Sequence, residues 1–291
     1  MNKQKISQFH DKNYKKLLLI PFILLILSLS YLGYFYSQNG DFFSKDISLT
    51  GGTTVTLYGD FSQAQITADL SEELNDLNTR IIYDLITNEQ KALILETKTE
   101  GDETKQVLED YLGYELNSDN SSFEFTGSSL SESFYKQLLV AILIAFIFMA
   151  LVVFVIFRTI VPSGAVIISA FADIIMTLAV VDLLGIKLSS AGIVAFLMLI
   201  GYSVDTDILL TTRILKRSGE INSKIFGAFK TGILMTLTSF FAILIALLII
   251  QSFSLILTQI FTILVIGLGF DILNTWITNV SILKWYVEKK K

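Results

Sequence analysis

Residues 165–184 have the sequence AVIISAFADIIMTLAVVDLL, with one aspartate at the centre and one near the end. An α-helix needs about 20 predominantly apolar residues to cross the hydrocarbon core of a bilayer. The chain contains six windows of this kind, at 17–36, 138–157, 165–184, 189–210, 229–250 and 255–280. We therefore predict an α-helical polytopic membrane protein with six transmembrane helices.

The composition excludes several classes of protein. Of the 291 residues, 52% are hydrophobic and 17% are charged, and the mean hydropathy of +0.61 is far above that of a soluble globular protein. The absence of cysteine excludes disulfides, thiolate metal sites and cysteine nucleophiles, and His10 is the one histidine. Because no nucleotide-binding loop or metal-ligand cluster is present, we expect no enzyme, no cofactor and no metal site.

The first window has a second interpretation. Three lysines precede its apolar run, as in a secretory signal peptide. The run is longer than the usual h-region, however, and no Ala-x-Ala cleavage site follows it. We therefore expect residues 17–36 to remain as a membrane anchor.

The charges divide between the two sides of the membrane. Residues 37–134 hold 19 Asp and Glu against 5 Lys and Arg. Fourteen Lys and Arg lie in the segments that an inside N-terminus would place in the cytoplasm, namely 1–16, 158–164, 213–228 and 281–291. Because basic residues near span ends concentrate on the cytoplasmic side, we expect both termini in the cytoplasm and an acidic head, 37–134, outside the cell membrane.

The pattern within 37–134 predicts an α+β head. Apolar and β-branched residues alternate at 53–58, 80–86, 92–97 and 122–126, with a turn at 87–89, whereas 66–77 and 102–112 have helical spacing. The resulting order, β-α-β-β-α-β, is that of a ferredoxin-like domain. Its acidity argues against nucleic acid as a partner. The charge serves either to keep an exposed head soluble or to bind basic or unfolded polypeptide along a sheet edge.

Five aspartates lie within the predicted spans: Asp173, Asp182, Asp205, Asp207 and Asp271. Ionisable residues at this depth are expensive, and burial disfavours the charged form of a carboxyl group. Such a group can take up an ion on one side of the membrane and release it on the other. The alternative is that the carboxyls only hydrogen-bond neighbouring helices.

The depth of each aspartate in its span helps to choose between an ion-relay role and a structural role. Asp182 lies near the interface, where we favour a structural role. We favour an ion-relay role for Asp173 and for the Asp205 and Asp207 pair. These two residues are about 200° apart on a helix, so one would face the interior and the other a cleft or a second subunit. Arg213 is the nearest cation along that helix.

The sixth span carries a polar stripe, formed by Asp271, Asn274 and Thr278. Their spacing places the three side chains on one helix face. Ion relay and helix packing are equally good interpretations of this stripe.

Several motifs resemble those of the SecF family of protein-export membrane proteins, which belongs to the RND-like superfamily. They are Asp173, Leu184-Gly185, Gly201-Tyr202-Ser203 and Arg213, together with Gly51-Gly52-Thr53 before the first strand of the head. The stretches 201–207 and 271–279 resemble the archaeal branch. Where bacterial members carry an aspartate five residues after the motif glycine, this chain has Thr206.

The resemblance implies a function and partners. It implies one span, a head and then five spans, joined with a SecD homologue into a twelve-span assembly at the Sec translocon channel. The head would hold unfolded preprotein while proton movement through the bundle changes its position. A structural subunit without ion coupling, or half of an RND-type small-molecule exporter, is the alternative. The motif glycines also have a local interpretation: Gly51 and Gly52 allow positive φ, and Gly201, Tyr202 and Ser203 allow close approach of helices.

Overall fold

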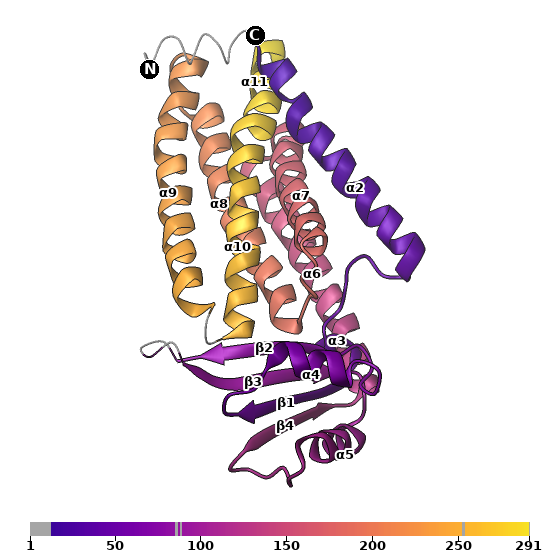
Figure 1. The fold of residues 1–291 in the computed structure, drawn as a ribbon. Coiled ribbons are helices and arrows are strands. Elements are labelled where there is room, and N and C mark those ends of the chain that lie inside the picture. The colour runs from indigo at the N-terminus through magenta and orange to yellow at the C-terminus, as the bar shows by residue number, and fades with distance from the viewer. Residues whose placement is uncertain (1–12, 85–86, 88, 252–253, 291) are drawn as a thin grey trace.

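The computed structural model describes residues 13–84, 87, 89–251 and 254–290. These residues form a bundle of long helices that stands on one side of a small β-sheet (Figure 1). The first described residues and the last helix lie at the end of the bundle opposite the sheet. Residues 1–12, and with them most of the predicted N-terminal segment, lie outside the described residues.

The described part of the chain contains six helices long and apolar enough to cross a membrane. They are α2 (Leu19–Asn39), α6 (Ser128–Phe157), α7 (Ile160–Leu183), α8 (Ser190–Lys216), α9 (Ile221–Ile250) and α10 (Leu255–Leu273). The last continues through a π-helical segment, Asn274–Asn279, into α11 (Val280–Lys290). Residues 281–290, predicted as a tail, are therefore helical, and Leu283 packs among the apolar side chains of this end of the bundle.

The helices differ in how much of each is buried. About half of α7 and of α8 is buried, whereas few residues of α2, α6 and α9 are buried. The helices α6, α7, α8 and α10 contribute side chains to a common core, in which Leu199 of α8 and Ile263 of α10 are fully buried. An apolar surface of this extent on the outer helices matches contact with lipid or with further helices.

The head follows α2 and a short helix, α3 (Ile47–Thr50). Its order is β1 (Gly52–Tyr58), α4 (Gln63–Leu70), β2 (Asn78–Tyr83), β3 (Gln90–Thr97), α5 (Gly101–Leu112) and β4 (Ser121–Thr126). The four strands form an antiparallel sheet in the order β2-β3-β1-β4. Val55 lies opposite Leu95 on one side and Phe123 on the other, and Val55 and Leu95 enter a core with Leu108 of α5.

Two head elements differ from the prediction. The helix predicted over 66–77 ends at Leu70. It cannot continue to residue 77, because the backbone amide of Asn75 donates to the Thr99 hydroxyl and its carbonyl accepts from the Lys98 amide. The strand predicted over 80–86 is β2, which begins at Asn78 and ends at Tyr83. Residues 85, 86 and 88 lie outside the described residues, so part of this strand and of the turn at 87–89 cannot be compared.

Candidate functional site

Three of the five membrane aspartates meet inside the bundle. Asp173 comes from the middle of α7, Asp207 from α8 and Asp271 from the end of α10, and the exposed fraction of each side chain is 0%. We call these three residues the acid cluster. The helices that carry it are the most buried ones, because small residues such as Ala170 and Ser203 let them approach closely.

Asp173 joins α7 to both of its neighbours. Its Oδ2 accepts a hydrogen bond of 2.6 Å from the Ser203 hydroxyl of α8, and its Oδ1 accepts one of 2.7 Å from the side-chain amide of Asn274. Thr278 in turn donates to Oδ1 of Asn274 at 3.1 Å. The polar stripe predicted on the sixth span therefore faces the interior and bonds the third span.

The π-helical segment connects the other two carboxylates. Its wider turn places Thr275 Oγ1 2.9 Å from Oδ1 of Asp207 and 3.0 Å from Oδ1 of Asp271. Asn279 donates to Oδ1 of Asp207 at 2.7 Å. Oδ2 of Asp207 and of Asp271 and Oδ1 of Asn279 are buried and have no hydrogen-bond partner among the described residues. Short π-helical stretches of this kind are frequent at functional sites.

The two aspartates of the fourth span face in different directions, as their spacing requires. Asp207 is buried, whereas Asp205 is exposed on the bundle surface beside Gly201 and Tyr202. Thr206 is buried against Thr236 of α9, with 3.4 Å between the two hydroxyl oxygens. Asp205 therefore lies on a face of α8 that the other described residues leave uncovered.

Arg213 and Gly201 of the fourth span have surroundings that their positions in the sequence do not predict. Arg213 pairs with no aspartate of the span: its guanidinium donates to the Gly227 carbonyl and, at 2.9 Å, to the Thr231 hydroxyl. Gly201 allows no close approach here, because a Cβ added to it would meet nothing within 4 Å. Among the described spans, close approaches occur instead at Gly192, against Gln259, at Gly232, against Trp276, and at Gly267, against Leu199.

Asp182 and the glycine pair have structural surroundings. Asp182 accepts hydrogen bonds from the Tyr31 hydroxyl, at 2.6 Å, and from the Ser44 amide, at 2.7 Å, and so ties α7 to α2 and to the start of the head. Gly51 and Gly52 have φ of 85° and 147°, and a Cβ on Gly52 would collide with the Thr97 carbonyl. Thr53 bonds the Thr99 carbonyl at 2.7 Å. The Gly-Gly-Thr motif thus sets how the chain passes from α3 into β1.

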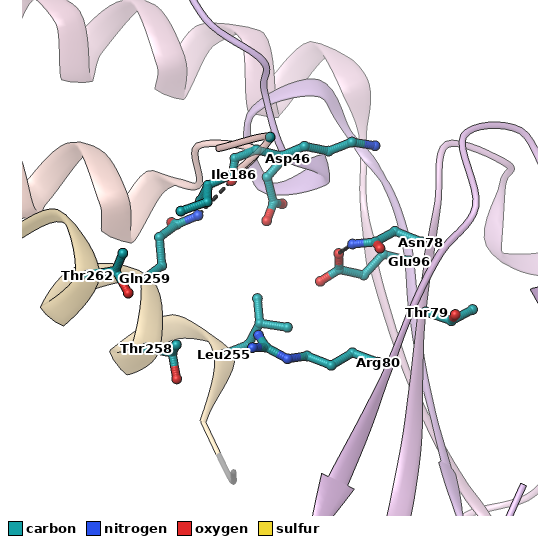
Figure 2. A pocket seen from close by; sticks show the side chains of 12 residues that line it. Asp46, Asn78, Thr79, Arg80, Glu96, Ile186, Leu255, Thr258, Gln259 and Thr262 are labelled. Carbon is teal, nitrogen blue, oxygen red and sulfur yellow. Dashed lines mark hydrogen bonds between the residues drawn. The ribbon is translucent and has the colours of Figure 1, made fainter. Parts of the chain in front are cut away.

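A cavity of about 350 Å³ lies between the head and the bundle and is lined by residues of both. Figure 2 shows Asp46, Glu96 and Arg80 extending into it from the head, opposite Gln259 of α10. Burial raises the pKa of Glu96, and the neighbouring carboxylate of Asp46 raises it further. Burial likewise raises the pKa of Asp46, against the hydrogen bond from the Ser48 amide.

The loop between α7 and α8 fastens the head to the bundle. Leu188 exchanges backbone hydrogen bonds with Ser44 and Asp46, at 2.7 and 3.0 Å. Lys187 donates to Asp76 of the head at 2.7 Å, and its carbonyl accepts a 2.6 Å bond from Gln259. The same loop joins the helices that carry Asp173 and Asp207, so the acid cluster and the head are linked through one short segment.

Sequence reasoning did not single out Thr275, Asn279 or Gln259. Thr275 and Asn279 follow Asp271 at intervals of four, a spacing that places side chains on one helix face and that could have identified them. Gln259 gave no such signal, because its partners Lys187 and Ser189 are distant in the sequence. Among the described residues, no group of three or more His, Asp or Glu has an arrangement that could hold a metal ion.

Known proteins similar to this chain are membrane components of protein export. Residues 106–289 match the family model of the C-terminal part of protein-export membrane protein SecD/SecF. The protein-export membrane protein SecF of Methanocaldococcus jannaschii is 41% identical over 96% of this chain and 97% of its own length. That of Methanothermobacter thermautotrophicus is 37% identical over 95% and 94%.

The fold also matches a larger solved protein. The crystal structure of SecDF, a translocon-associated membrane protein from Thermus thermophilus, superposes with a TM-score of 0.73 at 19% identity. The match covers 95% of this chain and 38% of the SecDF chain. With near-full-length relatives above 30% identity and a matching family model, the chain belongs to the SecF family of protein-export membrane proteins.

Proposed function

We propose that this protein is an accessory subunit of the Sec protein-export machinery, which promotes the passage of unfolded preproteins across the cell membrane. The observation that carries this function is the 41% identity to a SecF over 97% of that protein's length. Deletion of the gene should slow export of Sec-dependent proteins, and re-expression of the chain should restore it. Unchanged export in the deletion strain would contradict the proposal.

A SecD homologue is the proposed partner, at the translocon channel. One observation in support is that this chain matches only 38% of the SecDF chain, which leaves the larger part of that protein without a counterpart here. Further support comes from Asp205, because a carboxylate facing lipid is expensive and a partner helix would cover it. Since the chain has no cysteine, Tyr202→Cys can be cross-linked cleanly to single cysteines in the SecD homologue, with exposed Leu143→Cys on α6 as control.

For the orientation, we propose cytoplasmic termini and an extracytoplasmic head. The distribution of lysine and arginine supports this assignment, and α11 and the start of α2 lie at the end of the bundle opposite the head. A membrane-impermeant thiol reagent added to intact cells should label a cysteine at Glu124 of the head but not one at Lys289. The reverse pattern would contradict the orientation.

The proposed class of the head is ferredoxin-like. The strand order β2-β3-β1-β4 and the two helices between strands are those of this class. Two edge strands, β2 and β4, are available for an extended polypeptide to add to the sheet, and Phe125 of β4 is 58% exposed. The acidic surface would favour basic segments of the preprotein.

Ion coupling through the acid cluster is the proposed mechanism, with the proton motive force as the energy source. A change in the charge of Asp173 or Asp207 would alter the hydrogen bonds between α7, α8 and α10. The loop that carries Lys187 would transmit the resulting shift to the head. For such a shift to do work, the two conformations must differ in their affinity for the ion.

The acid cluster can be tested by single substitutions. Asp173→Asn and Asp207→Asn should each reduce gradient-dependent export in vesicles by at least about tenfold, with assembly intact. Asp205→Asn should weaken assembly with the partner instead. Normal export by the first two variants across an imposed proton gradient would contradict ion coupling and favour the alternative, a structural subunit without ion coupling.

An RND-type small-molecule exporter is the other alternative. Such a transporter would need a drug-sized apolar pocket in its external part, and the cavity beside the head is lined by Asp46, Arg80, Glu96 and Lys187. Co-purification separates the two functions, because a translocon subunit is expected for export of proteins and an outer duct protein for export of drugs.

A further inference from the structure

The hydroxyl of Thr275 lies between two carboxylates. Its oxygen is 2.9 Å from Oδ1 of Asp207 and 3.0 Å from Oδ1 of Asp271, and all three residues have an exposed fraction of 0%. A hydroxyl carries one hydrogen, so it can donate to one of these oxygens at a time. Its lone pairs face the other oxygen.

Counting hydrogens shows which protonation state fits this geometry. With both carboxylates ionised, Thr275 could donate to only one Oδ1, and its lone pairs would repel the other. Two negative charges would also share one fully buried site. With one proton present, an unbroken chain forms in which an acid O–H donates to Thr275 and Thr275 donates to a carboxylate. Every oxygen of the chain is then paired.

The neighbours of each carboxylate indicate where the proton lies. Oδ1 of Asp207 also accepts the 2.7 Å hydrogen bond from Asn279, which favours the ionised form at this residue. Thr275 is the partner of Oδ1 of Asp271, and Oδ2 of Asp271 has no partner among the described residues. In this arrangement Asp271 carries the proton and Asp207 the charge.

The charged groups on the surrounding helices have other partners. Asp173 of α7 is bonded by Ser203 and Asn274. Arg213 of α8 reaches α9, Lys224 of α9 bonds the Ile214 carbonyl, Lys230 of α9 is exposed, and Lys284 of α11 lies 4.9 Å from the Tyr14 ring centre. The ion pairs between described residues do not include the acid cluster. A proton is therefore the charge available to balance the two carboxylates.

We propose that Asp271 and Asp207 share one proton and exchange it through the hydroxyl of Thr275. In the transfer, the O–H bond at Oδ1 of Asp271 breaks and its proton moves to Oγ1 of Thr275. The hydrogen that Thr275 carried passes to Oδ1 of Asp207, which becomes the neutral acid as Asp271 becomes the carboxylate. No oxidant, metal or further reactant takes part.

This inference rests on the proposed ion coupling and adds a bridge to it. It gives the charge movement a direction: the negative charge moves from Asp207 of α8 to Asp271 of α10 in one step. Asp173 is bonded by Ser203 and Asn274 and is not part of the bridge. It interacts electrostatically with the charge on this pair. Thr275 itself is neutral before and after the transfer, so its hydroxyl is needed although it never titrates.

Matched substitutions at Thr275 test the bridge in the complete complex. Thr275→Val has nearly the shape of threonine without the hydroxyl, whereas Thr275→Ser keeps the hydroxyl. Thr236→Val on α9 is the control, because Thr236 is buried and its hydroxyl lies 3.4 Å from that of Thr206 and bonds no carboxylate. We expect Thr275→Val to lower proton-driven export at least about tenfold, and Thr275→Ser and Thr236→Val to stay within about twofold.

Infrared spectroscopy separates the bridge from a packing effect. The carboxylic acid C=O band of the wild type, followed against pH, should contain a component that Asp271→Asn removes. In Thr275→Val this component should change frequency and titrate over a different pH range, whereas in Thr275→Ser it should not. An unchanged band and unchanged export in Thr275→Val would overturn the bridge, as would equal losses in the Ser and Val variants.

The infrared result also keeps this inference distinct from the proposed function. If Asp207→Asn exports normally but Thr275→Val still displaces the acid band, the shared proton exists and the coupling fails. If Asp207→Asn is defective and a sodium gradient alone drives export of Thr275→Val at the wild-type rate, the coupling stands and the proton bridge is overturned.

Discussion

The side-chain amide of Asn274 lies 2.7 Å from Oδ1 of Asp173 and joins the π-helical end of α10 to the middle of α7. Both side chains are fully buried, so neither group can turn to water. A buried carboxylate that loses a donor bears the desolvation cost of an unpaired group. This bond therefore fixes both the packing of two helices and the charge environment of the acid cluster.

Replacing Asn274 by leucine should destabilise the bundle by about 1–3 kcal/mol, because the size is kept and the donor to Asp173 is lost. Thermal unfolding in detergent measures the change. In the double variant with Asp173→Leu, the loss should be less than the sum of the two single losses, since no unpaired carboxylate remains. Additive losses would contradict this account of the bond, and Gln251→Leu at the exposed end of α9 serves as control.

Close packing between α8 and α10 gives a second prediction. A Cβ on Gly267 would lie 2.5 Å from a methyl carbon of Leu199, which is fully buried, so Gly267→Ala should cost about 1–3 kcal/mol through overpacking. Gly269 is the matched control on the same helix, because a Cβ there meets nothing within 4 Å. Gly269→Ala should be neutral or stabilising by up to about 1 kcal/mol. Equal losses of thermal stability in both variants would contradict the packing.

The sequence predicts the number of spans and the order of the head elements because these depend on local patterns. Twenty apolar residues have few alternatives to a transmembrane helix, and alternation in 53–58 or 92–97 indicates a strand without knowledge of its partner. The angular separation of Asp205 and Asp207 is equally local, and it correctly requires that only one of them face the interior.

Properties that depend on distant partners could not be predicted in this way. The helix predicted to continue to residue 77 stops at Leu70 because Asn75 bonds residues more than twenty positions away. Arg213 was the nearest cation to Asp205 along the sequence, yet it bonds the neighbouring helix α9. The π-helical turn that places Thr275 between two carboxylates has no composition of its own that would identify it.

The cavity between the head and the bundle gives a prediction about how stability depends on pH. Burial and Asp46 raise the pKa of Glu96, so the folded protein binds this proton more tightly than the unfolded chain does. The protonated form thus stabilises the fold at pH below the ordinary value, and this contribution disappears as the pH rises through the raised pKa. Glu96→Gln should therefore be more stable than the wild type at neutral pH, with the difference shrinking in acid.

Thermal unfolding of the purified complex between about pH 4 and pH 8 measures this difference, a range that begins near the ordinary pKa of a glutamate. Glu124→Gln, on the exposed side of β4, is the control and should show no such trend. A stability gain for Glu96→Gln that grows as the pH falls would contradict the assigned direction.

The ion pair between the head and the α7–α8 loop responds to pH in the opposite sense. Burial alone would raise the pKa of Asp76, but hydrogen bonds from Lys187 and Lys98 outweigh it and lower the pKa. The carboxylate thus stabilises the junction at pH above its ordinary value, and the contribution is lost as the pH falls through the lowered pKa. Because Asp76 is 40% exposed, we expect only about 0.2–1 kcal/mol from the pair with Lys187.

Amide hydrogen exchange at Leu188 measures this junction, because that amide donates to the Ser44 carbonyl across it. Lys187→Met should speed exchange at Leu188 up to about fivefold at neutral pH and low salt, less at high salt, and little in acid, where Asp76 becomes neutral. Lys98→Met removes the other cation from the same carboxylate but leaves the link to the bundle, so exchange at Leu188 should change less. If both variants speed exchange equally, or if Lys187→Met has its largest effect in acid, the pair does not hold the head to the loop between α7 and α8.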